Sequence, residues 1–294
     1  DVARIKFKNA IVATGSRAKK LPEKLVPAEC CLDAKGALDL ENVPKSLLVV
    51  GGGYIGLELG QVYAALGSKV TVIEMLPRIA AGCDDDLARP LVNRLKKQFA
   101  NIYTSAKLEG AKQTDKGVEI SFSIGDKQHK EKFDKLLVSV GRQPNTDNIG
   151  LEHTQVKVNE RGFIEVNARM ETADKRIFAI GDVAGDPMLA HKASREGIVT
   201  AEVIAGHPAE FDNRAIPAVV YTSPEVAWCG LTETEAKEAK RNVKVGKFPW
   251  GACGRAIAMG RPEGLTKVIA DAETNVVLGV GIAGEHAGDL IAEA

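Results

Sequence analysis

The hydrophobic positions of this chain change their spacing between Ser46 and Glu74, and the change predicts a strand, a helix and a second strand. An apolar run at Leu47–Val50 leads into three glycines and then into a helical pattern. A second apolar run, Val70–Ile73, ends on the acid Glu74. Unbroken apolar runs of this length are typical of strands buried on both faces of a parallel sheet. We therefore expect a βαβ unit here.

Other stretches predict further elements by the same criteria. Alternation over residues 107–133 indicates an antiparallel excursion. Acids at the start and bases near the end of residues 84–99 suit the dipole of a helix, which Pro90 is expected to kink or restart. Thr232 and Glu235 have the spacing of a capping box for a helix over 232–241. The other predicted strands are 4–13, 102–106, 135–140, 162–166 and 176–180, and the other predicted helices are 189–205 and one from Gly288.

The glycines after the first strand follow the dinucleotide-binding spacing G-x-G-x-x-G, at Gly51, Gly53 and Gly56. In this fingerprint the first glycine makes the turn, the second lets a pyrophosphate approach the backbone, and the third lets helix and sheet pack closely. The phosphates then lie at the positive end of the helix. A glycine-rich turn without a ligand is the alternative. Because strand, helix and Glu74 stand where the fingerprint requires them, a dinucleotide site in a Rossmann-like α/β domain is favoured.

Glu74 also predicts which nicotinamide cofactor binds. A carboxylate at the end of the second strand bonds a free ribose 2′-hydroxyl and repels a 2′-phosphate. Arg78 is the nearest cation in the sequence, and one flexible arginine after Pro77 does not make a phosphate clamp. NAD is therefore favoured over NADP.

Composition argues against several other classes of function. The 294 residues suit two or three domains. Lysine plus arginine equals aspartate plus glutamate, at 39 each, so no net charge attracts nucleic acid or acidic lipid. The most apolar window, Leu47–Leu66, contains Glu58 and Gln61, which argues against a membrane span. The chain opens without a signal-peptide pattern, and we expect a cytoplasmic protein.

The cysteines show neither a disulfide framework nor metal-binding spacing, as is typical of reduced thiols in a cytoplasm. They are Cys30, Cys31, Cys83, Cys229 and Cys253. The adjacent Cys30 and Cys31 could bind a soft metal or form a strained bridge, but two ordinary loop thiols are favoured. No metal site is predicted.

Two further residues are candidates for polar chemistry. Asp182 follows an apolar strand, at the sheet edge where ligands bind in open α/β sheets, although it could instead be a helix N-cap or a turn acid. His191 near a helix start could be a base, but a lone histidine there is more often a satisfied polar contact.

Six motifs stand in an order that points to a family. They are ATGS at 13–16, GGGYIGLE at 51–58, VGRQPN at 140–145, IFAIGD at 177–182, MLAHKASREG at 188–197 and YTSPEVAWCGLTE at 221–233. The chain thereby resembles the pyridine-nucleotide disulfide oxidoreductases, and among them the dihydrolipoamide dehydrogenases, over nearly its whole length. The resemblance implies a partial FAD domain over 1–40, an NAD domain over 41–150, a return to the FAD domain over 151–212, and a partial α+β interface domain over 213–294 that makes a homodimer.

The resemblance also implies individual roles. Along FAD it places Thr14, Gly15, Ser16, Asp182 at the ribityl and pyrophosphate region, and Met188, Leu189, Ala190 and His191 with their backbone beside the flavin pyrimidine. Around NAD it places Gly51, Gly52, Gly53, Tyr54, Ile55, Gly56, Leu57, Glu58, Glu74, Leu108 and Gly141. Glu58 would pair with a lysine that precedes residue 1. Tyr54 would gate the nicotinamide pocket, where dihydrolipoamide dehydrogenases more often have an aliphatic residue and glutathione reductases a tyrosine.

The implied activity is the FAD-dependent oxidation of dihydrolipoamide to lipoamide, with hydride transfer to NAD. The implied partners are a second copy of the chain and the lipoyl domain of a 2-oxo acid dehydrogenase complex. The family's first FAD fingerprint, its C-x-x-x-x-C pair and its His–Glu pair do not occur in these residues. We therefore expect a piece of the enzyme that binds NAD but has no catalytic residue or lipoamide activity of its own. Mercuric reductase and soluble transhydrogenase stay open within the family, and a non-catalytic NAD-binding or dimerising module stays open outside it.

Overall fold

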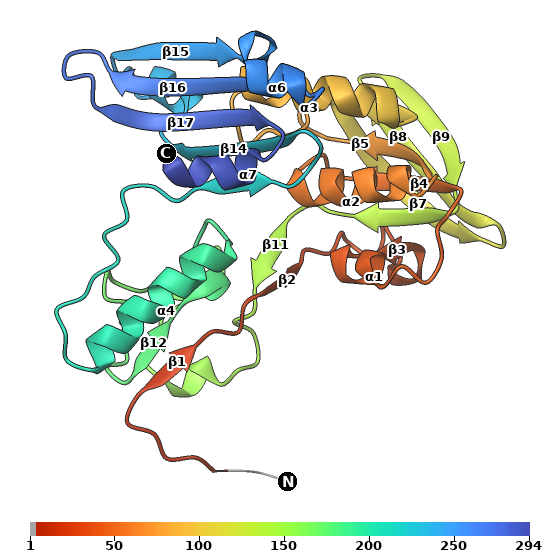
Figure 1. Ribbon diagram of the computed structural model, residues 1–294. Coiled ribbons are helices and arrows are strands. Elements are labelled where there is room, and N and C mark those ends of the chain that lie inside the picture. The colour runs from red at the N-terminus through yellow and green to blue at the C-terminus, as the bar shows by residue number, and fades with distance from the viewer. Residues whose placement is uncertain (1–3) are drawn as a thin grey trace. The chain divides into compact units, whose positions relative to one another are not determined.

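The computed structural model describes residues 4–294, which form two compact units (Figure 1). The smaller unit joins residues 4–18 to Arg142–Ile216, and the larger unit joins Lys19–Gly141 to Pro217–Ala294. Each unit is therefore assembled from segments that are distant in the sequence. The division into segments 1–40, 41–150, 151–212 and 213–294 stays a prediction.

A five-stranded parallel sheet forms the centre of the larger unit. Its order is β3 (Cys31–Leu32), β10 (Lys135–Val138), β4 (Ser46–Val50), β5 (Lys69–Ile73) and β6 (Asn101–Tyr103). Leu47 and Val49 of β4 pack with the helices α2 (Tyr54–Ala65) and α3 (Asp85–Gln98), whereas Leu48 packs on the opposite face. Both faces of β4 are therefore buried, which explains its unbroken apolar run. The short helix α1 (Ala34–Asp39) follows β3.

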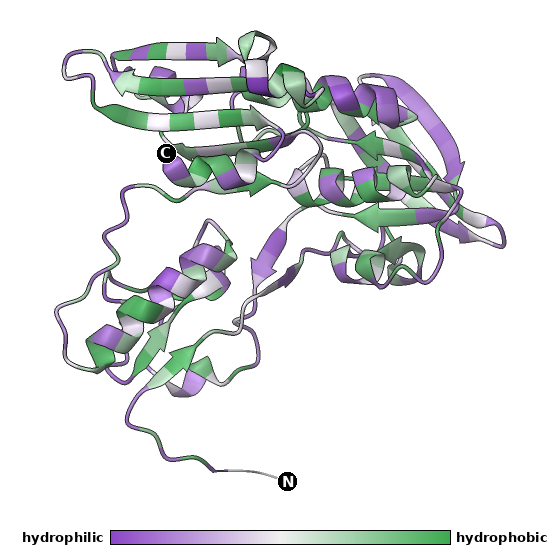
Figure 2. Cartoon of the chain, viewed as in Figure 1, coloured by the Kyte–Doolittle hydropathy of each residue, from purple (hydrophilic) through white to green (hydrophobic). Residues whose placement is uncertain are grey.

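The opposite face of the parallel sheet packs on the predicted antiparallel excursion. Its strands are β7 (Ala106–Thr114), β8 (Gly117–Ile124) and β9 (Lys127–Phe133), in that order. Ile120 and Phe122 of β8 are fully buried and join the core cluster that contains Leu48. Most of β9 is hydrophilic, as Figure 2 shows. The part of the larger unit around the parallel sheet is thus a three-layer structure, with helices on one side and a second sheet on the other.

The C-terminal part of the larger unit is a five-stranded antiparallel sheet. Its order is β13 (Ala218–Val220), β14 (Glu225–Gly230), β17 (Val277–Gly284), β16 (Leu265–Asp271) and β15 (Val243–Pro249). Helices α5 (Glu233–Glu238), α6 (Gly254–Ala258) and α7 (Ala287–Leu290) accompany it. A Cβ on Gly281 of β17 would lie 2.2 Å from Leu87 Cδ1, so α3 packs directly on this sheet. Helix α3 therefore belongs to the cores of both sheets.

The smaller unit contains two short strand pairs and one long helix. Strand β1 (Ala10–Val12) pairs in parallel with β12 (Ile177–Ala179), and β2 (Ser16–Ala18) pairs antiparallel with β11 (Arg142–Pro144). Helix α4 (Ala190–Ile204) buries Val199 and Val203 against Phe178. The 3₁₀ turns of the chain are η1 (Ala28–Cys30), η2 (Leu151–His153), η3 (Gly181–Val183), η4 (Trp250–Ala252) and η5 (Ile291–Glu293).

Several expected elements differ from those observed. The strand expected over 4–13 covers only Ala10–Val12, and residues 162–166 make an isolated bridge from Ile164 to Val158 instead of a strand. An alternating pattern makes a strand only where a neighbouring strand supplies hydrogen bonds, and β12 is long enough to pair three residues. Pro90 does not restart α3, which is one continuous helix. The strand expected over 102–106 ends at Tyr103, and Ala106 already begins β7.

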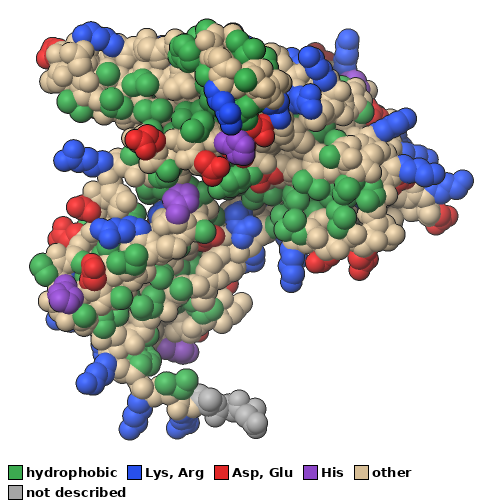
Figure 3. Space-filling model, viewed as in Figure 1, with side chains coloured by type: hydrophobic (Ala, Val, Ile, Leu, Met, Phe, Trp, Pro, Cys, Tyr) green, Lys and Arg blue, Asp and Glu red, His purple; other side chains and the backbone are tan. Residues whose placement is uncertain are grey.

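The predicted capping box of α5 is confirmed, with Thr232 as N-cap and Glu235 at the third helical position. Over residues 4–294, the helices are all too short or too polar to cross a membrane. Side chains of both charge signs occur on the face seen in Figure 3, as the equal numbers of acids and bases lead one to expect.

Candidate dinucleotide sites

Glu74 points into the glycine turn after β4. Its Oε2 accepts a hydrogen bond from the N–H of Gly52 at 2.6 Å, and its Oε1 accepts one from the N–H of Leu76 at 2.7 Å. A carboxylate oxygen can accept more than one hydrogen bond, so both oxygens keep acceptor capacity for a ribose diol. The acid is partly exposed and fixed from two sides. It has the position that the fingerprint requires.

The three fingerprint glycines are constrained differently. Gly51 has φ of +107°, and a Cβ there would lie 2.2 Å from the carbonyl oxygen of Ser139. A Cβ on Gly56 would lie 2.3 Å from the carbonyl oxygen of Gly51. A Cβ on Gly53, by contrast, would have no heavy atom within 4 Å. Packing within the protein therefore requires glycine at the first and third positions, whereas the second faces open space that a pyrophosphate fits.

Helix α2 presents its first turn at the same place. Gly53 is its N-cap and has no side chain with which to cap the helix. Ile55 is partly buried and Leu57 is fully buried in the core, while Tyr54 is 44% exposed. The helix is therefore anchored by its apolar residues and leaves backbone N–H groups of its first turn on the side of Gly53, as an anion site needs.

Glu58 lies one turn into α2 and bonds the C-terminal part of the chain. Its Oε1 accepts a hydrogen bond from the N–H of Tyr221 at 2.8 Å. Burial raises the pKa of Glu58, and the bond from Tyr221 opposes this rise. Gln61, on the next turn, bonds both the N–H and the carbonyl of Ser223 at 2.6 and 2.9 Å. These contacts tie the segment before β14 to the nucleotide helix.

Leu108 lies on β7, and Gly141 lies in the segment between β10 and β11. Strand β7, which carries Leu108, begins where the Ala106 N–H donates to the Glu74 carbonyl at 2.9 Å. Leu108 itself is partly buried against the core below the parallel sheet. Gly141 is exposed, two residues after Ser139, the residue that contacts Gly51. Whether either residue touches a nucleotide stays a prediction.

Arg78 is engaged away from Glu74. Its guanidinium donates to the carbonyl oxygens of Cys83 and Ala81 at 2.9 and 3.1 Å, and it forms an ion pair with Asp85 at 2.9 Å. The nearest cation in sequence is therefore occupied by its own loop. This agrees with the expectation that no phosphate clamp stands beside Glu74.

In the smaller unit, Ser16 at the start of β2 meets Asp182 in η3. The Ser16 hydroxyl donates to Asp182 Oδ2 and accepts from Arg142 Nε, the latter at 2.7 Å. Thr14 and the Gly15 carbonyl bond Asn145, so the ATGS and VGRQPN motifs face each other. Asp182 lies in η3, and it is Leu189 that forms the N-cap of α4.

The residues expected beside the flavin pyrimidine surround the start of α4. Met188 and Leu189 are partly buried, and Ala190 and His191 are exposed. Leu189 offers no polar side chain to cap the helix, so the first turn of α4 is suited to meet an external acceptor. The structure thus brings Thr14–Ser16 and Asp182 together in one unit, and Gly51–Glu58 and Glu74 together in the other.

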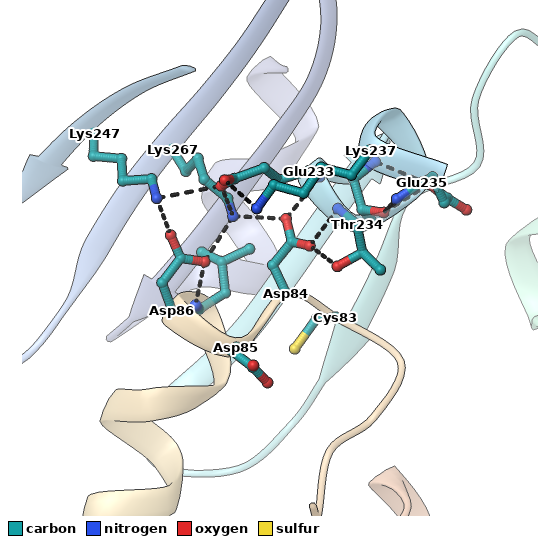
Figure 4. A network of polar contacts seen from close by, with 12 residues as sticks. Cys83, Asp84, Asp85, Asp86, Glu233, Thr234, Glu235, Lys237, Lys247 and Lys267 are labelled. Atoms are coloured by element: carbon teal, nitrogen blue, oxygen red, sulfur yellow. Dashed lines mark hydrogen bonds and ion pairs between the residues drawn. The ribbon is translucent and has the colours of Figure 1, made fainter. Parts of the chain in front are cut away.

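Sequence reasoning missed a charge network between α3 and the antiparallel sheet (Figure 4). Lys267 on β16 is 1% exposed, and its Nζ lies 2.6 Å from both Asp84 Oδ2 and Asp86 Oδ1 and 3.4 Å from Glu233 Oε2. Asp84 also accepts from the backbone N–H groups of Glu233 and Thr234 at 2.9 and 3.0 Å, and so caps α5 from another element. Lys247 pairs with Asp86 at 2.7 Å.

The environment keeps these groups charged. Burial alone would raise the pKa of Asp84, but hydrogen bonds from Lys267, Thr234 and the α5 backbone outweigh it and lower the pKa from 3.8 to about 2. Burial alone would lower the pKa of Lys267, and its bonds to Asp84 and Asp86 raise it instead. Three carboxylates lie together here, but the Lys267 ammonium occupies the position of a metal ion among them. The acids at 84–86 are visible in the sequence, but their partner is 181 to 183 residues away.

The cysteines of residues 4–294 are all free thiols. Cys30 lies in η1 and Cys31 on β3, so the expectation that both lie in a loop is wrong. Burial raises the pKa of Cys83 to about 12, so this thiol is inert at neutral pH. Within the same residues, the group just described is the one cluster of potential ligands close enough for a metal ion.

Comparison with known proteins places the chain in a family. Residues 1–197 match the model of the pyridine nucleotide-disulphide oxidoreductases, and residues 216–294 match the dimerisation domain of that family. The dihydrolipoyl dehydrogenase of Thermus scotoductus is 50% identical over 288 residues, which are 97% of this chain and 62% of that protein. That of Geobacillus stearothermophilus is 46% identical over 287 residues, which are 98% of this chain and 61% of that protein.

Solved structures with a similar fold include a flavoprotein disulfide reductase. The HOCl-induced flavoprotein disulfide reductase RclA from Escherichia coli has a TM-score of 0.87 at 28% identity, over 96% of this chain and 65% of that chain. LpdA from Mycobacterium tuberculosis has a TM-score of 0.88 at 25% identity, over 97% of this chain and 62% of that chain. The chain spans about three fifths of the length of the curated relatives. The predicted α/β fold with a dimerisation domain is confirmed, and the chain belongs to the pyridine nucleotide-disulphide oxidoreductase family.

Proposed function

We propose that this chain is the nucleotide-binding and interface portion of a dihydrolipoyl dehydrogenase, which oxidises dihydrolipoamide to lipoamide and reduces NAD. The observation that carries the proposal is the carboxylate of Glu74, held 2.6 Å from the Gly52 N–H at an open glycine turn. Relatives named dihydrolipoyl dehydrogenase are 50% and 46% identical, compared with 28% for RclA. This difference favours the dihydrolipoamide/lipoamide couple over other dithiol/disulfide couples as the substrate.

The larger unit would hold NAD. Glu74 would accept hydrogen bonds from the adenosine ribose diol, Gly53 would leave room for the pyrophosphate, and the first turn of α2 would donate N–H groups to it. The carboxylate disfavours a 2′-phosphate by charge repulsion, and Arg78 is occupied by Asp85 and two carbonyls. NAD is thus the proposed cofactor. Tyr54, Leu108 and Gly141 would line the nicotinamide and adenine ends.

The smaller unit would hold part of FAD. The Asp182 carboxylate has a donor from Ser16 on Oδ2 and keeps acceptor capacity for ribityl hydroxyls. Thr14–Ser16 and the start of α4 would lie along the same cofactor. When bound, FAD would supply the two-electron carrier between a dithiol and NAD. Glu58, whose pKa is raised by burial, would meet a cation at the nicotinamide end of α2.

The partners follow from the same assignment. The match of residues 216–294 to the family's dimerisation domain supports a homodimer made by the antiparallel sheet. The lipoyl domain of a 2-oxo acid dehydrogenase complex is the proposed source of dihydrolipoamide, and the cytoplasm is the proposed compartment. We propose neither nucleic acid nor membrane as a partner.

Steady-state kinetics of the complete natural protein test this function. The expected result is formation of NADH with dihydrolipoamide as substrate, a much slower reaction with NADP, and little reduction of mercuric ion. The Glu74→Gln variant should lose affinity for NADH and keep its flavin. Absence of dihydrolipoamide oxidation in a protein that binds both cofactors would favour another disulfide reductase, and absence of flavin would favour the non-catalytic module.

A further inference from the structure

A buried lysine and glutamate on α4 lie against the loop that carries Asp182. Lys192 Nζ and Glu196 Oε1 are 2.8 Å apart, one helical turn apart in sequence, and their side chains are 6% and 4% exposed. Burying two charges costs solvation free energy that their mutual attraction often does not recover. A gain in stability is therefore a poor explanation for the pair, and its hydrogen bonds to neighbouring groups offer a better one.

Both members bond the backbone of the loop. Glu196 Oε2 accepts a hydrogen bond from the Gly181 N–H at 2.6 Å. Lys192 Nζ donates to the Gly185 carbonyl at 3.1 Å and lies 3.5 Å from the Gly181 carbonyl. The pair thus forms hydrogen bonds with the backbone of both Gly181 and Gly185, the first and last residues of the loop. The ammonium and the carboxylate pair with each other and also bond backbone groups of the loop. These contacts use most of the hydrogen-bonding capacity of both side chains.

The loop needs such support because of its composition. Gly181 and Gly185 have φ of +75° and +144°, values that residues with a side chain rarely adopt. Glycine has more backbone freedom than other residues, and fixing it costs more conformational entropy. The segment between them is itself held in place, because Val183 is fully buried. The contacts of Lys192 and Glu196 therefore act on the two glycines, at the ends of the segment.

Asp182 lies between Gly181 and Gly185, the two residues whose backbone the pair bonds. Its carboxylate is also held by Ser16, whose hydroxyl accepts from Arg142 at 2.7 Å. The side chain is therefore fixed through Ser16, and its backbone through the buried pair. A group held in its binding orientation before the ligand arrives pays less entropy on binding.

We propose that Lys192 and Glu196 are positioning residues for FAD, which hold the Gly181–Gly185 loop so that Asp182 meets the ribityl hydroxyls. This inference rests on the proposed function, because it assumes that FAD is the ligand of Asp182. Neither residue touches the cofactor in this account. They act through the loop backbone.

The test measures FAD affinity in apoprotein prepared from the complete natural protein, by quenching of flavin fluorescence. Lys192→Met and Glu196→Gln should each raise the dissociation constant for FAD about tenfold or more, which is about 1.4 kcal/mol. The dissociation constant for FAD of the double variant should rise by less than the product of the two single fold-changes. The reason is that the second substitution removes a charge that the first has already left unpaired. Arg195→Met is the matched control, since Arg195 is on the same helix, is 44% exposed and lies 3.9 Å from Asp212.

A second measurement separates positioning from general stability. NADH affinity belongs to the other unit and should stay within about twofold in every variant, while far-UV circular dichroism shows that the fold is kept. If the unsubstituted protein binds FAD and both single variants bind it equally well, the inference is overturned and the proposed function stands. A lower melting temperature of the variant apoproteins with unchanged FAD affinity also overturns it. If the unsubstituted protein takes up no FAD, the inference and the proposed function are both overturned.

Discussion

Replacing Lys267 by methionine should weaken the larger unit where α3 meets the antiparallel sheet. Methionine has a similar length and keeps the packing of the lysine stem, but it removes the ammonium that lies 2.6 Å from both Asp84 and Asp86. Asp84 then stays buried, at 4% exposed, without a cation. Lys247 stays beside Asp86 and Glu233, so part of the network keeps its charge balance.

The structure gives the size of the effect. The fall in the pKa of Asp84 from 3.8 to about 2 corresponds to about 2 kcal/mol of stability at neutral pH. Removing one partner of a buried ion pair costs about 3 to 5 kcal/mol. Because Lys247 stays in place, we expect the lower end, about 3 kcal/mol. With a urea m-value of about 3 kcal/mol/M, the unfolding midpoint should fall by about 1 M.

The pH dependence has a definite sign. Asp84 has a lowered pKa in the folded chain, so its contribution is present above its unfolded value of 3.8 and is lost as the pH falls through about 2. Lys267 has a raised pKa, so its contribution is present below 10.5 and is lost only as the pH rises through its folded value. The difference between the natural chain and Lys267→Met should therefore be constant from about pH 5 to 9 and narrow in acid.

Urea unfolding, followed by tryptophan fluorescence, measures this difference. Both tryptophans, Trp228 and Trp250, belong to the antiparallel part of the unit, and Trp228 packs beside Gly82, just before Asp84. Lys244→Met on the exposed strand β15 is the control and should change stability by less than about 0.5 kcal/mol. An unchanged midpoint for Lys267→Met at pH 7 would refute the reasoning.

Three further predictions concern the two nucleotide sites and the thiols. Gly53→Ala should fold normally but bind NADH about tenfold more weakly, as calorimetric titration can show. Gly56→Ala should instead destabilise the fold, because its Cβ would lie 2.3 Å from a carbonyl oxygen, and thermal melts measure this loss. Asp182→Ala should weaken FAD binding at least tenfold without changing NADH affinity, and equal FAD affinity in a titration would contradict its role. Cys83, with a pKa of about 12, should resist iodoacetamide at pH 8 until urea unfolds the chain, as peptide mass spectrometry can show.

The nucleotide-binding turn could be predicted from the sequence because its parts are close together in the chain. The apolar runs of β4 and β5, the glycine spacing and Glu74 all lie within 29 residues, Ser46 to Glu74. The bond from Gly52 to Glu74 was not predicted and is a finding of the structure. The helix at 84–99 and the capping box of α5 were predicted for the same reason. Local patterns decide local structure.

Elements that depend on distant partners were predicted less well. Residues 162–166 were expected to be a strand, but strand formation depends on a partner that the sequence does not specify. Lys267 appears in an ordinary strand pattern, and its role arises from acids 181 and 183 residues earlier. Lys192 and Glu196 have the spacing of a helical ion pair, but nothing in that spacing shows that both are buried against the loop at 181–185.

Glu74 and the first turn of α2 are proposed to bind a dinucleotide without a 2′-phosphate. Titration of the chain and of its Glu74→Gln variant with NADH and with NADPH tests this most directly. We expect the chain to bind NADH at least about tenfold more tightly than NADPH, and the variant to lose most of this preference, since hydrogen bonds to a charged group contribute about 1.5 to 3 kcal/mol. Equal affinity for the two nucleotides, or an unchanged preference in the variant, would contradict the proposal.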